Sequence, residues 1–228
     1  MLLRKWEDIP EFMKNDDVKR YYDILSKKRF SLILKRFFDI VMSSILLIVL
    51  LPVFLILAIW IKIDSKGTVF YRQERITQYG RTFRIFKFRT MVSNADKIGT
   101  LVTTQNDSRI TKVGEKIRKC RLDEIPQLIN IFVGDMSFVG TRPEVKRYVD
   151  AYTDEMKSTL LLPAGVTSLA SIKYRDEDEI IKQETDKGKT VDQVYIEDVL
   201  PEKMKYNLEY IYYFTIAKDV NLCVKTMI

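Results

Sequence analysis

The sequence predicts a helix-dominated α/β protein that contains a re-entrant membrane helix and a small β-hairpin. Three observations support this fold class. One apolar segment is long enough to enter a bilayer, a short stretch of β-forming residues follows it, and most of the remaining chain has apolar residues at helical spacing. At 228 residues the chain is long enough for one domain of ordinary size with an appendage.

Residues 1–36 are predicted to be an amphipathic N-terminal lead-in. Apolar side chains such as Val18, Tyr21 and Leu25 recur there among charged ones. A helix of this kind can lie on a membrane surface with its apolar side in the interface, and this is the placement we expect.

Residues 37–61 are predicted to form the re-entrant membrane helix, kinked at Pro52. The 22 residues from Ile40 to Ile61 carry no charge, and about 20 apolar residues suffice to span a hydrocarbon core. Pro52 interrupts the helix hydrogen bonds in the middle of the segment. Lysines and arginines flank both ends, which favours a hairpin with both ends in the cytosol. A straight transmembrane helix is the alternative, because such helices tolerate proline.

Residues 62–228 are predicted to form a cytosolic domain that begins with the β-hairpin. The two arms lie within Val69–Met91, and Thr77–Gly80 supplies the turn. Helices are expected after it at 111–121, Leu122–Phe132, Tyr148–Leu162 and Met204–Ile228, of which the last can pack on the domain or on the membrane interface.

The charge of the chain is unevenly distributed. Residues 62–147 carry eighteen Lys/Arg against nine Asp/Glu, whereas residues 148–228 carry ten against fifteen. The middle block should therefore bind an anionic partner, which can be nucleic acid, lipid headgroups or a phosphorylated small molecule.

The sequence contains no histidine and two cysteines, Cys120 and Cys223. The lack of histidine excludes Ser-His-Asp and Cys-His catalysis, as well as histidine-ligated metals. Two cysteines are too few for a disulfide framework or a zinc site.

Asp123 and Glu124 form an adjacent carboxylate pair inside the basic block. An ionised carboxylate attacks phosphorus without a general base, and a helix N-terminus would hold Asp123 ionised. Glu124 could hold Mg²⁺, which prefers oxygen ligands. Taken alone, however, such a pair more often caps a helix. The cations expected to bind phosphoryl oxygens are Arg84, Lys87, Arg89, Arg118 and Arg142.

Several strings occur along the chain in a particular order. They are Lys35-Arg36 with Asp39, Phe86-Lys87-Phe88-Arg89-Thr90-Met91, Asp107-Ser108-Arg109-Ile110-Thr111, Leu122-Asp123-Glu124-Ile125-Pro126-Gln127-Leu128, Gly134-Asp135-Met136-Ser137-Phe138-Val139-Gly140 and Arg142-Pro143. Together they resemble the monotopic phosphoglycosyl transferases, the bacterial sugar transferases that start lipid-linked glycan assembly. The resemblance covers roughly Lys35 to Ala170.

The resemblance implies a two-step transfer at the cytosolic face of the bacterial inner membrane. Asp123 attacks the β-phosphate of a nucleotide sugar, usually a UDP-sugar, and polyprenyl phosphate then takes the phospho-sugar from it. Glu124 corresponds to the Mg²⁺ partner, Arg118 to the phosphate-binding arginine, and Arg142 to the arginine of an Arg-Pro motif. Residues 62–228 would then be the catalytic domain of a small, core-only member.

The chain departs from the family pattern at a few positions. Leu51 precedes the proline where a small polar residue is common, and Thr68 and Thr141 stand where proline is usual. The stretch 165–170 matches only in part, so the identity of the sugar does not carry over.

Two other functions remain alternatives. A membrane-anchored, Mg²⁺-dependent phosphohydrolase would use the same carboxylates and arginines with water as acceptor. A non-enzymatic binder of anionic lipid or nucleic acid would use the basic block alone. We expect no nucleic acid partner, because nucleic-acid binders interleave exposed aromatic residues with their charges.

Overall fold

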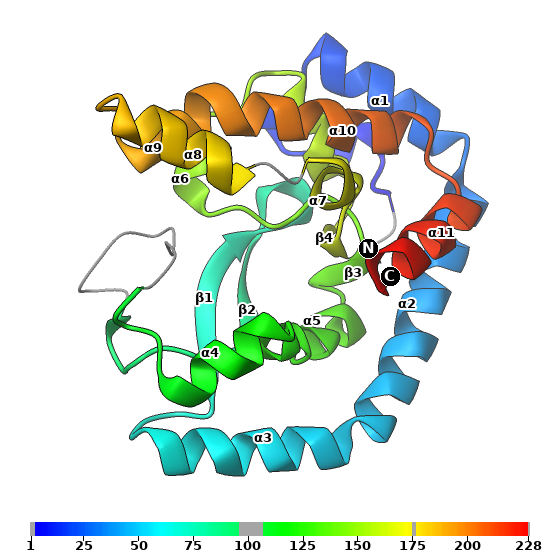
Figure 1. The fold of residues 1–228 in the computed structure, drawn as a ribbon. Coiled ribbons are helices and arrows are strands. Elements are labelled where there is room, and N and C mark those ends of the chain that lie inside the picture. Colours follow the sequence, from blue (N-terminus) through cyan, green and yellow to red (C-terminus); the bar gives the residue numbers. More distant parts are fainter. Residues whose placement is uncertain (1–2, 96–106, 175–176, 228) are drawn as a thin grey trace.

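The computed structural model describes residues 3–95, 107–174 and 177–227 (Figure 1). Helices predominate among them, as the sequence predicts. The α-helices are α1 Asp16–Ser26, α2 Arg29–Val49, α3 Leu51–Asp64, α4 Lys112–Lys119, α5 Gln127–Val133, α6 Lys146–Val149, α7 Leu169–Lys173, α8 Glu177–Asp186, α9 Val191–Val194, α10 Leu200–Tyr212 and α11 Ile216–Met227. The short 3₁₀ and π helices are η1 Trp6–Asp8, η2 Glu11–Met13, η3 Gln78–Gly80, η5 Leu122–Glu124, η6 Met156–Leu161 and η7 Tyr195–Val199. The strands are β1 Phe70–Ile76, β2 Thr82–Phe88, β3 Met136–Val139 and β4 Ala164–Thr167.

Strands β1 and β2 form the predicted antiparallel hairpin. Their register runs from Phe70 opposite Phe88 to Ile76 opposite Thr82. The predicted turn is also confirmed: η3 reverses the chain, with Tyr79 and Gly80 both in the left-handed region at φ 61° and 72°.

Strands β3 and β4 form a second sheet that the sequence did not predict. They run parallel, with Met136 opposite Ala164 and Val139 opposite Thr167. Strands of four residues carry too few side chains to show a period, and a parallel partner lies far along the chain. Local sequence signals therefore do not predict these two strands.

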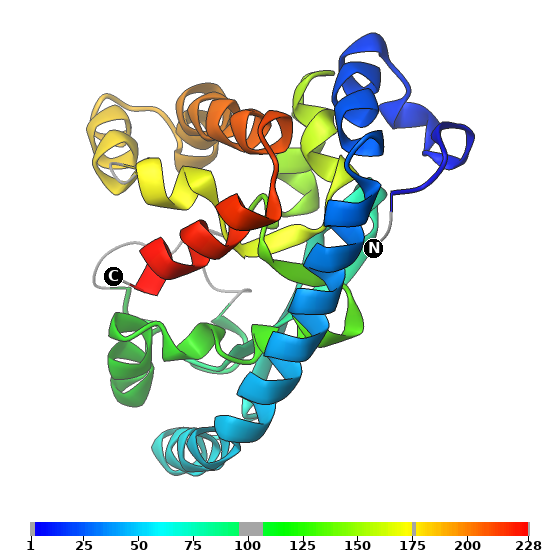
Figure 2. The same ribbon diagram turned by 90° about the vertical axis from the view of Figure 1, so that its right-hand side faces the viewer.

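Helices α2 and α3 form a bent pair, with α2 along the right-hand side of the molecule in Figure 1 and α3 along its lower edge (Figures 1 and 2). The helices meet at Leu50 and diverge by 60°, and Pro52 lies in the first turn of α3. Among the described residues no single helix is long and apolar enough to cross a membrane, whereas this bent pair meets that requirement by length and composition. Its re-entrant placement in a membrane remains a prediction.

The apolar side of α1, the main helix of the N-terminal lead-in, is buried inside the protein. Val18 and Leu25 of α1 are fully buried, and Tyr21 and Tyr22 are nearly so, in a cluster shared with α10 and η6. The expectation that this helix lies on the membrane by its apolar face is therefore wrong, because that face is already covered.

Two predicted helices are interrupted in the structure. The chain between Tyr148 and Leu162 forms the end of α6, a turn and then η6. Tyr152 and Leu161 are both buried in the same apolar cluster. In a straight α-helix these two side chains, nine residues apart, would lie on opposite faces. The C-terminal segment breaks into α10 and α11 around Phe214, and it packs on the domain through residues such as Met204, Ile211 and Phe214.

Two smaller apolar clusters position the hairpin. One joins β2, β3 and α5 to the end of α2, through Phe83, Ile131 and Met136 packed against Leu47. The other joins Leu57 and Ile61 of α3 to Phe88, Val113 and Ile117. The end of β2 therefore lies directly beside α4 and η5.

Candidate active site

Asp123 and Glu124 lie on η5, a single 3₁₀ turn between α4 and α5. Arg121 precedes this turn with a left-handed backbone at φ 53°, which reverses the chain after α4. The prediction of one helix over Leu122–Phe132 with Asp123 at its N-cap is wrong. Pro126 has no backbone N–H to continue the helix hydrogen bonds, so α5 begins only at Gln127.

Glu124 is the centre of an ion-pair cluster. Its Oε1 atom accepts from Lys87 Nζ at 2.9 Å and from Arg142 Nη2 at 3.1 Å, and its side chain is 13% exposed. Burial alone would raise the pKa of Glu124, but the charges of Arg142 and Lys87 outweigh it and lower the pKa to about 2. The same contact raises the pKa of Arg142. Three segments, β2, η5 and the loop after β3, are joined at this carboxylate.

Asp123 has the opposite electrostatic environment. Burial raises the pKa of Asp123; the neighbouring charge of Glu124 raises it too, while those of Lys87 and Arg118 lower it without reversing the shift. The α-helix N-terminus expected to hold Asp123 ionised is not there, because Asp123 lies on a single 3₁₀ turn. A raised pKa makes the carboxylate more basic, which is a favourable property for a nucleophile.

Arg118 of α4 has a buried donor, and its positive charge acts to lower the pKa of Asp123. Within the described residues its Nη1 atom is buried and has no hydrogen-bond partner. A buried cationic donor without a partner is costly, and an anionic ligand would satisfy it.

Arg89 and Arg84 lie apart from the cluster. Arg89 donates to the carbonyl oxygens of Lys66 and Ser65, both at 2.7 Å, and thus binds the C-terminal end of α3. Arg84 is exposed and pairs with Glu74 across the hairpin at 3.4 Å. These placements give no support to the expectation that either residue binds phosphate.

Asn130 holds β2 against α5. Its Oδ1 atom accepts from Phe86 N at 2.8 Å, and its Nδ2 atom donates to Arg84 O at 3.1 Å. These two bonds occupy the free edge of β2 on either side of Ile85, which fixes the position of Lys87 beside Glu124.

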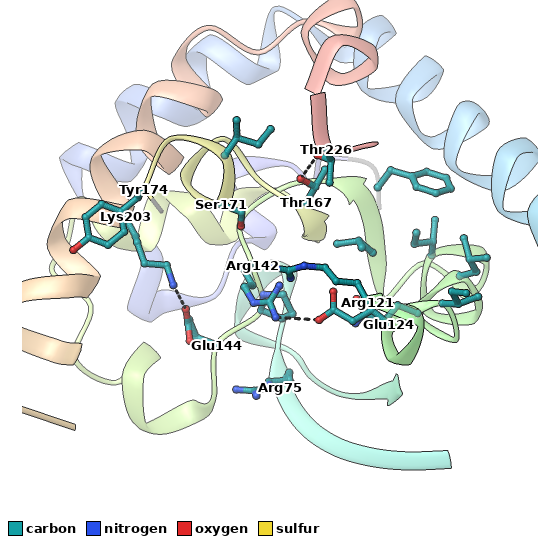
Figure 3. A pocket seen from close by; sticks show the side chains of 18 of the residues that line it. Arg75, Arg121, Glu124, Arg142, Glu144, Thr167, Ser171, Tyr174, Lys203 and Thr226 are labelled. Carbon is teal, nitrogen blue, oxygen red and sulfur yellow. Dashed lines mark hydrogen bonds and ion pairs between the residues drawn. The ribbon is translucent and has the colours of Figure 1, made fainter. Parts of the chain in front are cut away.

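A cavity of about 930 Å³ opens beside the cluster (Figure 3). Glu124, Arg142, Arg121 and Arg75 line one part of it. Asp123 and Lys87 are not among its lining residues, although both neighbour Glu124. The cavity is large enough for a ligand of nucleotide size.

The other part of the cavity wall was not predicted from the sequence. Tyr195 donates to Glu144 Oε1 at 2.6 Å, and Lys203 Nζ lies 3.1 Å from the Tyr195 hydroxyl oxygen and 3.1 Å from Glu177 Oε2. These residues come from α8, η7 and α10 and from the loop after Arg142. No local pattern marks them, since only the packing of the C-terminal helices brings them to the cavity.

The carboxylates of the site can be compared with the ligands that a Mg²⁺ ion requires. Within residues 3–95, 107–174 and 177–227 no group of three or more Asp, Glu, Cys or His side chains is placed to hold a metal ion. Mg²⁺ commonly uses only one or two carboxylates and takes its other ligands from water and substrate phosphates. Both ion pairs of Glu124 use Oε1, so Glu124 and Asp123 fit a site of this second kind.

The fold and the site together define a class of protein. A half-buried carboxylate pair, with converging lysine and arginine side chains beside a large cavity, is a site suited to phosphorylated ligands. The bent apolar helix pair on the same domain adds a surface suited to lipid.

Comparison with known proteins agrees with this class. The model of the bacterial sugar transferase family matches residues 30–228. The chain therefore belongs to the bacterial sugar transferase family, as the sequence resemblance predicts.

Individual relatives are similar over parts of the chain. The UDP-glucose:undecaprenyl-phosphate glucose-1-phosphate transferase of Escherichia coli K12 is 32% identical over 77% of this chain and 35% of its own length. The UDP-N-acetylgalactosamine-undecaprenyl-phosphate N-acetylgalactosaminephosphotransferase of Aeromonas hydrophila is 43% identical over 46% of this chain and 25% of its own length. Exopolysaccharide production protein ExoY of Sinorhizobium fredii is 37% identical over 55% of this chain and 62% of its own length. The matched regions thus span between a quarter and two thirds of these relatives.

Proposed function

We propose that this protein is a phosphoglycosyl transferase that moves a sugar 1-phosphate from a nucleotide sugar, most simply a UDP-sugar, to polyprenyl phosphate. The observation that carries the proposal is the shared Glu124 carboxylate. It holds Lys87 and Arg142 together beside Asp123 at the edge of a cavity of nucleotide size. Two of the relatives described above carry undecaprenyl phosphate and a UDP-sugar in their names.

In the first step Asp123 is the nucleophile. A carboxylate oxygen forms a bond to the β-phosphorus of the donor, the bond from that phosphorus to the bridging oxygen breaks, and UMP leaves with the electron pair. The phospho-sugar is then an acyl phosphate on Asp123. Burial and a raised pKa support this role for Asp123.

In the second step an oxygen of polyprenyl phosphate attacks the same phosphorus. The bond from phosphorus to Asp123 breaks, which regenerates the carboxylate and gives polyprenyl diphosphate sugar. Because both steps displace an anion at one phosphorus, the cations have the same task in each. Lys87, Arg118 and Arg142 bind the phosphoryl oxygens and compensate their charge.

Mg²⁺ bound by Glu124, with Asp123 beside it, would supply further charge neutralisation for the diphosphate. Glu124 itself orients Lys87 and Arg142, since both side chains donate to it. Binding of the donor phosphates would draw these two cations partly away from Glu124, which makes its carboxylate available for the ion.

The acceptor requires the protein to lie at a membrane. We place the α2–α3 pair in one leaflet as a re-entrant hairpin, with residues 62–228 on the cytosolic face of the bacterial inner membrane. Large apolar side chains are exposed along both helices, among them Phe37, Ile48, Leu55, Ile56 and Ile63. This arrangement brings a cytosolic nucleotide sugar and a leaflet-bound phosphate to the same interface.

The two alternatives predict different products. A phosphohydrolase would release UMP or sugar phosphate with water as acceptor, and a pure binder would release neither. The raised pKa of Asp123 and the converging cations at Glu124 are more than a binder requires, because binding by charge alone needs no half-buried carboxylate pair.

The test is UMP release from a panel of UDP-sugars by the full chain in detergent with Mg²⁺, with and without polyprenyl phosphate. We expect acceptor-dependent release with one donor, and a complete loss in Asp123→Asn. Asp150→Asn is the matched control, because it removes an exposed carboxylate paired with Lys146 on α6. Equal release without the lipid would favour the hydrolase, and full activity of Asp123→Asn would remove Asp123 from the mechanism.

A further inference from the structure

Three exposed lysines form a stripe along α4. Lys112, Lys116 and Lys119 are spaced by four and three residues, which places them on one side of the helix, and all three are exposed. The charge of Lys119 is offset by Glu115, with which it forms an exposed ion pair at 2.7 Å. We call Lys112, Lys116 and Lys119 the α4 lysine stripe.

A side of α4 adjacent to the stripe, roughly a quarter to a third of a turn from it, packs on α3. Val113 and Ile117 are buried against Leu57 and Ile61 in one apolar cluster. Packed helices lie roughly 8–10 Å apart, so α4 is one helix diameter further into the protein than α3. Figure 1 shows α3 along the lower edge of the molecule with α4 directly above it.

Helix α3 exposes apolar side chains over most of its length. Leu51, Leu55, Ile56, Ile59 and Ile63 are each more than half exposed. At its side, Lys116 Nζ lies 5.7 Å from the centroid of the Trp60 ring, so one lysine of the stripe already reaches toward α3. Trp favours the membrane–water interface, where its ring is apolar and its N–H is wet.

These positions fix the depth of the stripe. An interfacial helix lies roughly 5–10 Å into the boundary between headgroups and acyl chains. With α3 at that depth, α4 lies one helix diameter above it, at the level of the lipid phosphates. We infer that the α4 lysine stripe binds the headgroups of anionic phospholipids and gives the protein a preference for an anionic leaflet. The inference rests on the proposed membrane placement of α3 and adds to it a preference in lipid charge.

The two tryptophans of the chain make a local test possible. Trp6 lies on η1 against Tyr22, whereas Trp60 lies beside the stripe. Since the sequence has only these two, Trp6→Phe leaves Trp60 as the sole tryptophan donor, which is excited selectively at wavelengths that tyrosine does not absorb. The full-length Trp6→Phe protein is reconstituted into phosphatidylcholine nanodiscs that also contain unlabelled phosphatidylglycerol. A trace of dansyl-labelled phosphatidylglycerol or of dansyl-labelled phosphatidylcholine then reports which headgroup lies near Trp60.

We expect stronger energy transfer from Trp60 to the anionic probe than to the neutral one. Each lysine near an anionic membrane surface contributes about 1 kcal/mol to the free energy of binding, which corresponds to roughly a fivefold change in the local enrichment of anionic lipid. The difference between the probes should disappear in the triple variant Lys112→Gln, Lys116→Gln, Lys119→Gln. It should also shrink at high salt, because the Debye length falls.

A matched variant removes the same charge elsewhere. Lys146, Lys187 and Lys205 are equally exposed, each in a local ion pair, on or next to α6, α8 and α10 at the far end of the molecule from α3 (Figure 1). Changing these three to Gln should leave the probe difference intact. Melting curves and UMP release should be unchanged in both triple variants; if the stripe variant does not fold, the single change Lys116→Gln replaces it.

The outcomes separate this inference from the proposed function. Equal transfer to both probes would overturn the headgroup preference while keeping α3 at the membrane. No transfer to either probe would overturn both the inference and the membrane placement of α3. An equal loss in the matched variant would also overturn the inference, because total charge rather than the stripe would then be responsible.

Discussion

Lys35 and Asp219, which are 184 residues apart in the sequence, form a buried ion pair between α2 and α11. Lys35 also donates to Val139 O at 2.8 Å, and Tyr210 donates to the other oxygen of Asp219 at 2.8 Å. The pair therefore joins the proposed membrane helix, the last two helices and the end of β3. Arg142 follows three residues after that strand, so the same contacts support the position of the site.

Breaking this pair should destabilise the protein strongly. Lys35→Met leaves Asp219 buried without its cation, and the loss of one partner of a buried pair costs about 3–5 kcal/mol. Lys173→Met is the control, since it breaks an exposed pair with Glu209 and should cost less than about 1 kcal/mol. Denaturant unfolding of both variants in detergent gives the two values, and similar values would contradict the structural role of Lys35.

Gly114 allows α4 to approach the end of β2. A Cβ atom at this position would lie 2.0 Å from the carbonyl oxygen of Thr90, so Gly114→Ala must displace α4 and with it Arg118. We expect a loss of stability of about 1–3 kcal/mol or more, together with reduced UMP release.

Gly188→Ala is the control that shows the effect of backbone strain without a steric clash. Gly188 has a φ of 98° but nothing lies within 4 Å of its Cβ position, so its substitution introduces strain without a clash. Normal UMP release by Gly188→Ala with reduced release by Gly114→Ala is the expected pattern. Normal release and stability in Gly114→Ala would show that the approach to Thr90 is not needed.

Arg89 and Arg142 should differ in what their loss affects. Arg89 is 6% exposed and donates to the C-terminal end of α3, so Arg89→Met should lower the melting temperature and leave the KM for the donor unchanged. Arg142→Met should instead lower kcat/KM by roughly 10²–10³. Steady-state kinetics and melting curves on both variants distinguish the roles. Kinetic damage in Arg89→Met at unchanged stability would return Arg89 to the phosphate-binding set.

Cys223 should react slowly with alkylating reagents at neutral pH. Burial, and then the charge of Asp219, raise the pKa of its thiol to about 11. The thiolate is the reactive form, so its fraction and the alkylation rate should rise about tenfold for each pH unit below that value. Cys120 is exposed and serves as an internal reference in the same experiment.

Mass spectrometry after timed iodoacetamide treatment measures both cysteines in one sample. A rate at Cys223 that does not change with pH would contradict the assigned pKa shift.

Local sequence signals determined several elements of this protein. β-forming residues around a Gly-containing turn predicted the hairpin. The uncharged run predicted a kink at Pro52, whereas the structure bends the segment by 60° at Leu50 and has Pro52 in the first turn of α3. The string around Asp123 and Glu124, together with its neighbours, predicted the family. These signals are read within a few residues, where backbone preferences and side-chain spacing act directly.

Tertiary structure alone decided which charges meet. Lys87 and Arg142 both reach Glu124 because the hairpin and the loop after β3 converge on η5, whereas Arg89, two residues from Lys87, turns to α3. The parallel β3–β4 pair, the buried face of α1 and the contribution of Lys203 to the cavity were equally beyond local prediction. Each depends on the pairing of segments far apart in the chain, and a cation in a sequence has the same charge whichever partner it finds.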